Sequence, residues 1–128
     1  MENVAAYVEE LAHAAKEASR PLGFASNEAR CATVRAMAAA LRERADEVLA
    51  ANAADMEAAR AAGTNEGLLD RLLLNEARIE GMAAGLEALC DLPDPVGRVL
   101  EHRTIDQGLD LSRVSVPLGL VAMVYNRS

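Results

Sequence analysis

The sequence VSVPLGLVAMVYNRS occupies residues 114–128, and from Leu118 to Tyr125 it is apolar without a break. A strand with one face in water alternates apolar and polar residues, whereas a continuous apolar run is typical of a strand covered on both faces in a parallel α/β sheet. Such a sheet needs crossover helices and further strands. The run is too short to span a bilayer, which takes about 20 apolar residues. We therefore expect the chain to be the front part of a larger α/β protein.

Composition and charge favour a soluble, helical chain. Of its 128 residues 52% are apolar but only 2% are aromatic, and 26% are charged. The net charge of −7 argues against a nucleic-acid-binding surface. Cys31 and Cys90 lie far apart in the sequence and outside metal-ligand spacings, so we expect no disulfide framework and a reducing compartment. No signal peptide is visible at the N-terminus, so we expect a cytoplasmic protein without a membrane partner.

Apolar residues recur at helical spacing over residues 2–19, and we expect Pro21 to end this helix. Ser26 suits the N-cap of the next helix, with Glu28 in its first turn. Residues 27–62 contain no Gly or Pro and exceed one average helix, so we expect two helices, broken near residues 44–46.

Two shorter helices are expected next. Gly63 fits the left-handed position past a helix end, Thr64 is the expected cap of the first, and Asn75 that of the second. Gly81 and Gly85 weaken the second helix, and close helix packing would explain them. The apolar helix faces give the expected core positions: Cys31, Val34, Met37, Ala38, Leu41, Val48, Leu49, Asn52, Ala53, Met56, Leu68, Leu69, Leu72, Leu73, Ile79, Met82, Ala83, Leu86 and Cys90.

The chain changes character at residues 91–97, where two prolines and a glycine break the helical pattern. Residues 99–105 are a candidate strand, residues 106–108 a turn, and residues 109–113 alternate as a half-buried strand does. The predicted order is therefore helices first, an antiparallel strand pair next, and the opening strand of an α/β core last.

Chemistry-bearing motifs are few. The sequence has no GxxxxGK[ST] phosphate loop and no GxGxxG dinucleotide loop. His13 and His102 are isolated from each other, so we assign neither a catalytic role nor a metal. We interpret Cys31 and Cys90 as buried structural cysteines, because Cys90 lies near a helix C-terminus, which raises a thiol pKa.

Two polar residues of the expected helices are also given structural roles. Asn52 lies on an apolar face and must find a hydrogen-bond partner there, and we give it and Asp55 a structural role. The remaining acidic side chains are interpreted as solvated surface.

Several segments, in order, resemble the gamma-glutamyl phosphate reductase family of the aldehyde dehydrogenase superfamily. VLAANAAD at residues 48–55, followed by AARAAG at residues 58–63, is similar to its N-terminal helical region. LDRL at residues 69–72 looks like the family's MLDRL segment, and DPVG at residues 94–97 looks like its DPVG segment. GLDL and VPLG, at residues 108–111 and 116–119, resemble the approach to its first cofactor-domain strand.

The resemblance implies a truncated, aldehyde dehydrogenase-like α/β fold. It divides the chain into an N-terminal helical bundle at residues 1–97, antiparallel strands of a dimerisation region at 98–117, and the first strand of a Rossmann-like, cofactor-binding domain at 118–128. It also implies a homo-oligomer. Expressed by itself, such a chain is expected to aggregate or oligomerise through its C-terminal strands, because unpaired apolar strands invite association.

The resemblance also implies an activity. The family is an NADP-dependent oxidoreductase of proline biosynthesis: it reduces L-glutamyl 5-phosphate to L-glutamate 5-semialdehyde with NADPH, through a cysteine thiolate. That cysteine lies downstream of the part that this chain matches, and neither Cys31 nor Cys90 corresponds to it. By resemblance, Tyr125 and Asn126 approach the cofactor, although Asn126 stands where the family has Glu. We therefore expect the chain alone to be inactive; the alternative is a non-catalytic helical association module derived from the family.

Overall fold

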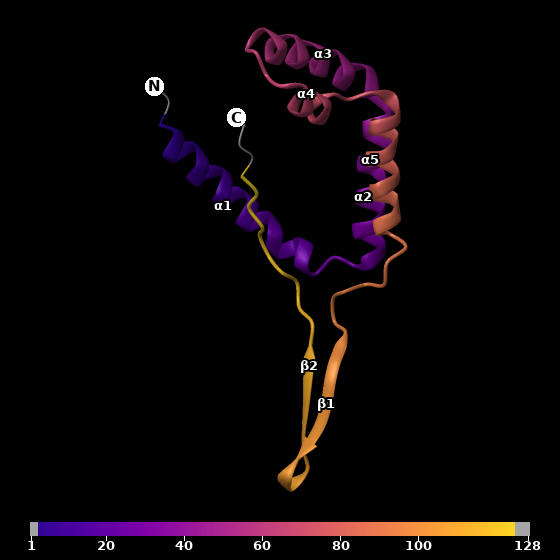
Figure 1. Cartoon of the computed structure of the whole chain (residues 1–128). Helices are drawn as coiled ribbons and strands as arrows, with labels where there is room; N and C mark the ends of the chain where they lie inside the picture. Colours follow the sequence, from indigo (N-terminus) through magenta and orange to yellow (C-terminus); the bar gives the residue numbers. More distant parts are fainter. Residues whose placement is uncertain (1–2, 125–128) are drawn as a thin grey trace. The chain divides into compact units, whose positions relative to one another are not determined.

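The computed structural model describes residues 3–124, which divide into two compact units. The helical unit is Cys31–Leu92, and the second unit combines the described residues up to Arg30 with those from Pro93 onward. The helices and strands, labelled in Figure 1, are α1 (Val4–Gly23), α2 (Asn27–Glu43), α3 (Ala45–Ala61), α4 (Glu66–Leu72), α5 (Glu76–Leu89), β1 (Val99–Ile105) and β2 (Leu109–Val114). A 3₁₀ turn, η1 (Asp106–Gly108), joins the two strands. Helices followed by an antiparallel strand pair is the predicted order.

The prediction that Pro21 ends the first helix is wrong, because α1 continues through Pro21 to Gly23. A proline in the last turn removes only one hydrogen bond from the helix. The turn closes without that bond: the Phe24 amide donates to the Pro21 carbonyl at 3.1 Å, and the Ala25 amide donates to the Leu22 carbonyl at 3.2 Å. Ser26 caps α2 as predicted, since its Oγ accepts the Ala29 amide at 3.1 Å.

The other helix ends follow from their caps. α2 and α3 are separate helices that meet at Arg44, as the sequence predicts. Gly63 has φ +75°, and beyond it the Thr64 amide donates back to the Ala59 carbonyl at 3.1 Å, which closes α3 in a Schellman-type end. Thr64 therefore takes part in the turn that closes α3 and does not cap α4. That cap is Asn65, whose Oδ1 accepts the Leu68 amide at 3.0 Å.

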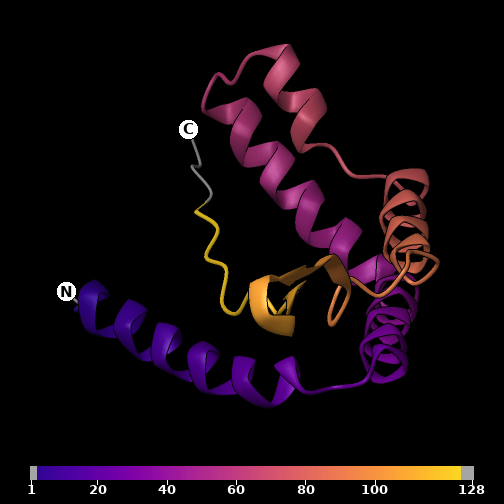
Figure 2. The ribbon, with the colours of Figure 1, turned by 90° about the horizontal axis from the view of Figure 1, so that it is seen from below.

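Within the helical unit, α4 folds back beside α3, and α5 also contacts α3 (Figure 2). Asn75 caps α5 as predicted, accepting the Arg78 amide at 2.8 Å. The buried residues of the described chain are few: Ala38, Asn52, Met56, Ile79 and Ala83. All five are among the predicted core positions.

Other predicted core positions are exposed, and these predictions are wrong for the chain by itself. Met37 and Met82 are 53% and 43% exposed, and Ala53 is exposed as well. Leu68, Leu72 and Leu73 are also exposed. An ideal Cβ at Gly81 or Gly85 would meet nothing within 4 Å, so among the described residues no close packing explains these glycines. The apolar stripes of the helices are wider than the core that the described residues build.

Asn52 joins α3 to the connection between α4 and α5. Its Nδ2 donates to the Leu72 carbonyl at 2.8 Å, and its Oδ1 accepts the Leu74 amide at 2.7 Å. Asn52 is only 7% exposed, and both hydrogen bonds are partly buried. The structural role predicted for Asn52 is confirmed, and its partners are backbone groups of a segment that no helix satisfies.

A second link joins α2 to α5 on the outside of the helical unit. The Arg42 guanidinium donates to both oxygens of Glu80, at 2.7 and 2.8 Å, and to Glu87 Oε1 at 2.6 Å. These hydrogen bonds hold the pKa values of the Glu80 and Glu87 carboxyls below their usual range and raise that of Arg42. For these two carboxylates, the solvated-surface interpretation is incomplete.

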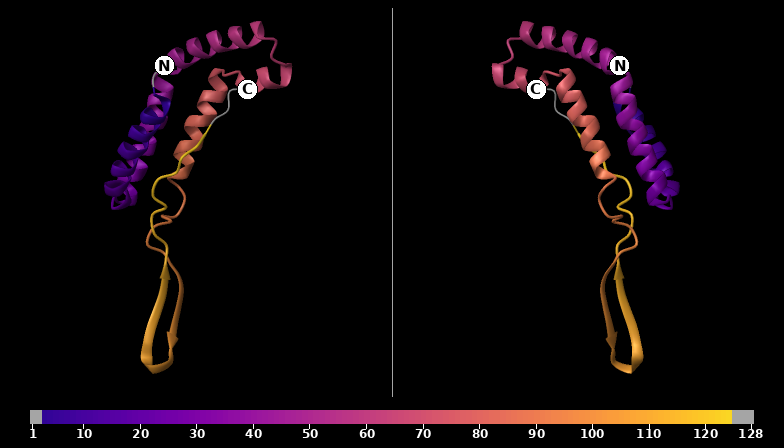
Figure 3. Two further views of the ribbon diagram at one scale, coloured as in Figure 1. Left: turned by 90° about the vertical axis from the view of Figure 1, so that its left-hand side faces the viewer. Right: turned by 90° about the vertical axis from the view of Figure 1, so that its right-hand side faces the viewer.

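The second unit contains the hairpin, a two-stranded antiparallel ribbon (Figure 3). Its register pairs Ile105 with Leu109 across the turn, where Gln107 and Gly108 have φ +72° and +76°. In the same unit Arg30 anchors the approach to β1: its Nη2 lies 2.7 Å from Asp94 Oδ1, which also accepts the Val96 amide at 3.0 Å. Every residue of both strands is exposed.

Residues 118–124 form no strand, contrary to the prediction for the apolar run. Leu118 and Val124 are 88% and 96% exposed, so neither face of this segment is covered. A strand exists only where a neighbour satisfies its amides and carbonyls, and the described residues offer no such neighbour to this segment. Tyr125 lies outside the described residues.

Asn52→Ala tests the link between α3 and the α4–α5 connection. The change leaves the Leu72 carbonyl and the Leu74 amide without their partner, at a cost of about 1–3 kcal/mol for each group. We expect urea denaturation to show a loss of about 2–4 kcal/mol in the free energy of unfolding. Glu57→Ala, an exposed position on the same helix, is the matched control and should change it by less than about 0.5 kcal/mol. Equal losses in both variants would contradict the assignment.

Arg42→Met tests the link between α2 and α5. The two carboxylates have depressed pKa values in the folded chain, so their contribution is present above the unfolded pKa of about 4.3 and is lost as the pH falls through the folded value. We expect the variant to melt below the wild type at pH 7 and the difference to shrink as the pH falls below about 4.3. Thermal melting followed by circular dichroism measures this, and a difference independent of pH would contradict the ionic origin.

Candidate functional site

Tyr125 and Asn126, the predicted cofactor-binding residues, lie outside the described residues. The structure therefore gives no geometry for them. Within residues 3–124, the side chains that bear on function are the two histidines, the two cysteines, an apolar groove on the helical unit and the exposed apolar faces of the second unit.

The two histidines have separate partners. His13 is on α1, 79% exposed, with Nε2 3.9 Å from Glu9. His102 is on β1, where Nδ1 lies 2.9 Å from Ser112 Oγ and Nε2 lies 3.8 Å from Asp110, both on β2. Over the described residues, no group of three or more His, Cys, Asp or Glu side chains is arranged to hold a metal ion. These contacts tie the two strands together across one face.

Cys31 and Cys90 come together in the helical unit, although 59 positions separate them. The Cys90 thiol donates to the Cys31 carbonyl at 3.5 Å, and Cys31 Sγ lies 4.0 Å from the Cys90 carbonyl. Partial desolvation raises the pKa of the Cys90 thiol, and the neighbouring Cys31 raises it further. A raised thiol pKa is the opposite of what a nucleophile needs. Both cysteines are half-buried, less than the sequence interpretation expected.

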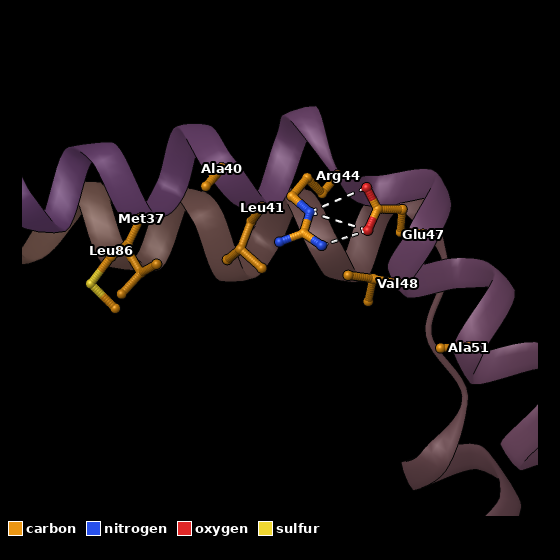
Figure 4. Close-up of a pocket in the computed structure, with 8 residues that line it drawn as sticks. All are labelled: Met37, Ala40, Leu41, Arg44, Glu47, Val48, Ala51 and Leu86. Carbon is orange, nitrogen blue, oxygen red and sulfur yellow. Dashed lines mark hydrogen bonds and ion pairs between the residues drawn. The ribbon is translucent and has the colours of Figure 1, made fainter.

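A groove of about 550 Å³ opens on the helical unit (Figure 4). Its lining comes mainly from α2 and α3, with one residue from α5: Met37, Ala40, Leu41, Arg44, Glu47, Val48, Ala51 and Leu86. The two charged members pair with each other, Arg44 Nη2 lying 2.6 Å from Glu47 Oε2, and this pairing raises the pKa of Arg44. The other lining residues are apolar. The groove can therefore accept apolar surface but brings no acid, base or nucleophile to a substrate.

The hairpin has one apolar and one polar face near its turn. Ile105, Leu109 and Leu111 share the first face, and they are 41%, 59% and 44% exposed. On the opposite face, Thr104 donates to Asp110 at 2.7 Å beside the His102–Ser112 pair. The sequence pattern predicted the alternation of residues 109–113, but only the register shows that Ile105 joins the same apolar face.

α1 carries a second exposed apolar stripe in the same unit. Val4, Tyr7, Val8 and Leu11 recur at helical spacing and are 69%, 62%, 55% and 52% exposed. Such a stripe normally faces a core, and the described residues provide none for it. Among the helices that the structure describes, none has the length and apolar character needed to cross a membrane.

Comparison with known proteins gives one consistent result. No protein-family model matches the chain. Gamma-glutamyl phosphate reductase of Caulobacter vibrioides is 49% identical over 111 residues, which are 87% of this chain and 27% of that protein. The protein of the same name from Shewanella sediminis is 42% identical over 125 residues, 98% of this chain and 30% of its own length. The chain thus spans less than a third of the length of these curated relatives.

Solved structures agree with the sequence comparison. The crystal structure of gamma-glutamyl phosphate reductase from Thermotoga maritima matches 84% of this chain and 26% of its own chain, with a TM-score of 0.79 and 39% identity. That of Saccharomyces cerevisiae matches 84% of this chain and 28% of its own, with a TM-score of 0.77 and 34% identity. Sequence and fold together show that this chain is homologous to the N-terminal part of gamma-glutamyl phosphate reductase.

Proposed function

We propose that this chain forms the N-terminal part of a cytoplasmic, NADP-dependent oxidoreductase that reduces L-glutamyl 5-phosphate to L-glutamate 5-semialdehyde in proline biosynthesis. The observation that carries the proposal is the match of 87–98% of the chain, at 42–49% identity, to proteins named for this reaction. The chain contributes scaffold and association surfaces to that enzyme and is inactive alone.

The chemistry of the described residues supports the inactivity of the isolated chain. The reaction implied by the resemblance needs an activated thiolate, and the pKa of the Cys90 thiol is raised by burial. The groove of α2, α3 and α5 does not fit a dinucleotide either, because it is apolar and its one arginine is paired with Glu47. No hydride-transfer step is therefore assigned to these residues. Tyr125 and Asn126 remain the proposed cofactor contacts in the complete enzyme.

The exposed apolar surfaces support the scaffold role. Burying a Leu, Val or Met side chain is worth about 1.5–3 kcal/mol. Residues 118–124 leave Leu118, Val121, Met123 and Val124 at least 60% exposed, so covering them yields an energy comparable to a domain's net stability of about 5–15 kcal/mol. We propose that residues 118–128 form a strand in the cofactor-binding domain of the complete enzyme, and that residues 98–117 belong to its dimerisation region. No observation favours an independent association module over this reading.

A chimera tests the proposed function. This chain replaces the aligned 27% of the Caulobacter vibrioides reductase, and turnover is followed as NADPH formed from glutamate 5-semialdehyde, phosphate and NADP. We expect the chimera to be active, and both the 128-residue chain alone and the reductase without its aligned segment to be inactive. A chimera that folds but does not turn over, or turnover by the chain alone, would contradict the proposal.

The hairpin's apolar face supplies a second test, of association. We expect the purified chain to elute above its monomer mass in size-exclusion chromatography with light scattering, because Ile105, Leu109 and Leu111 favour burial against a second copy. Leu109→Lys combined with Leu111→Lys should lower the oligomer fraction several-fold. Ser112→Lys, on the polar face of the same strand, is the control and should leave it unchanged. A monodisperse wild-type monomer would overturn the role of this face.

A further inference from the structure

The two cysteines lie where the start of α2 meets the end of α5. Cys31 lies in the second turn of α2, and Cys90 is the C-cap of α5. The two helices run antiparallel, because the start of α2 meets the end of α5 at the cysteines while Arg42, near the end of α2, meets Glu80 near the start of α5. The cysteines are not joined by a disulfide.

Their contacts are reciprocal, since each sulfur lies beside the other residue's backbone carbonyl, at 3.5 and 4.0 Å. A disulfide requires Cα atoms about 4.4–6.8 Å apart and Cβ atoms that face each other. Each sulfur reaches the other residue's main chain, which places the two side chains next to each other where the start of α2 meets the end of α5.

We propose that Cys31 and Cys90 are a redox-responsive pair, which a hydroperoxide closes into an intrachain disulfide between α2 and α5 and a small thiol reopens. This modification site is independent of the proposed function, which uses neither cysteine. The Arg42 link holds the two helices together near one end, and the disulfide would fix them at the other.

The chemistry balances with the peroxide as oxidant. One cysteine thiolate attacks a peroxide oxygen, the O–O bond breaks, and hydroxide leaves to take up a proton as water, which produces a sulfenic acid. The second thiol then attacks the sulfenic sulfur, the S–O bond breaks, and a second water leaves as the S–S bond forms. Two thiols and one hydrogen peroxide thus give one disulfide and two waters. Two molecules of glutathione return the pair to thiols, with glutathione disulfide as the product.

The groups around the Cys90 thiol set the rate at which the disulfide forms. Arg35, one helical turn from Cys31, favours the Cys90 thiolate, whereas burial, Cys31 and Asp91 disfavour it and leave the pKa raised. Only a small share of the thiol is ionised at neutral pH, so the pair should respond to sustained oxidant and not to brief exposure. Closing so long a loop restricts the unfolded chain, and the closed form should melt at a higher temperature.

The test uses the 128-residue chain and hydrogen peroxide itself. After oxidation and alkylation, the band of single-chain mass on a non-reducing denaturing gel should yield tryptic peptides 31–35 and 79–98 as one linked species, and glutathione should separate them. We also expect the oxidised chain to melt about 5 °C or more above the reduced chain. Cysteines recovered only as intermolecular dimers, or only as sulfinic acids on separate chains, would overturn the proposal.

Two controls separate positioning by the fold from mere reactivity. Cys31→Ala combined with Val34→Cys moves the thiol one turn along α2, away from Cys90, and should reduce linkage at least about tenfold. Oxidation of the wild-type chain in 6 M guanidinium chloride (about the concentration that unfolds even hyperstable domains) should likewise reduce the linked fraction. Linkage as efficient in either control as in the native chain would show that the fold does not position the pair.

Discussion

The helical unit depends on the two hydrogen bonds of the Asn52 side chain. Between α4 and α5 the chain must turn without a helix of its own, and its partly buried backbone groups need partners. Asn52 supplies one donor and one acceptor to Leu72 and Leu74, at 2.8 and 2.7 Å. An apolar residue would pack there but would satisfy neither group. The position of α5 against α3 follows from this constraint.

Around that link the core is small, and the exposed apolar area is large. Five residues are buried in the described chain, while α1, the hairpin and residues 118–124 leave apolar side chains in water. The relatives that the chain matches are more than three times its length. The exposed stripes keep the periodicity of core-facing elements, and this periodicity is the basis of the association role proposed above.

Local signals in the sequence were sufficient for most of the architecture. The break at Arg44, the left-handed Gly63 and the caps Ser26 and Asn75 each depend on a few neighbouring residues, so they could be predicted directly. The errors have physical reasons. Pro21 removes only one backbone hydrogen bond from the last turn of α1, so the helix continues through it. The Thr64 amide closes the end of α3, and Asn65, the next residue, is the N-cap of α4. The strand expected at residues 118–124 needs a neighbour that the described residues do not contain.

The sequence by itself determined the helix count, the strand pair, the need of Asn52 for a partner and the family resemblance, because periodicity, capping and motif order are all local properties. Only the tertiary structure decided which groups meet across long separations. It brought Cys31 to Cys90, set Arg42 between Glu80 and Glu87, and placed Ile105 on the same face as Leu109. Such contacts depend on how helices and strands pack in three dimensions, and they cannot be predicted from residue spacing along the chain.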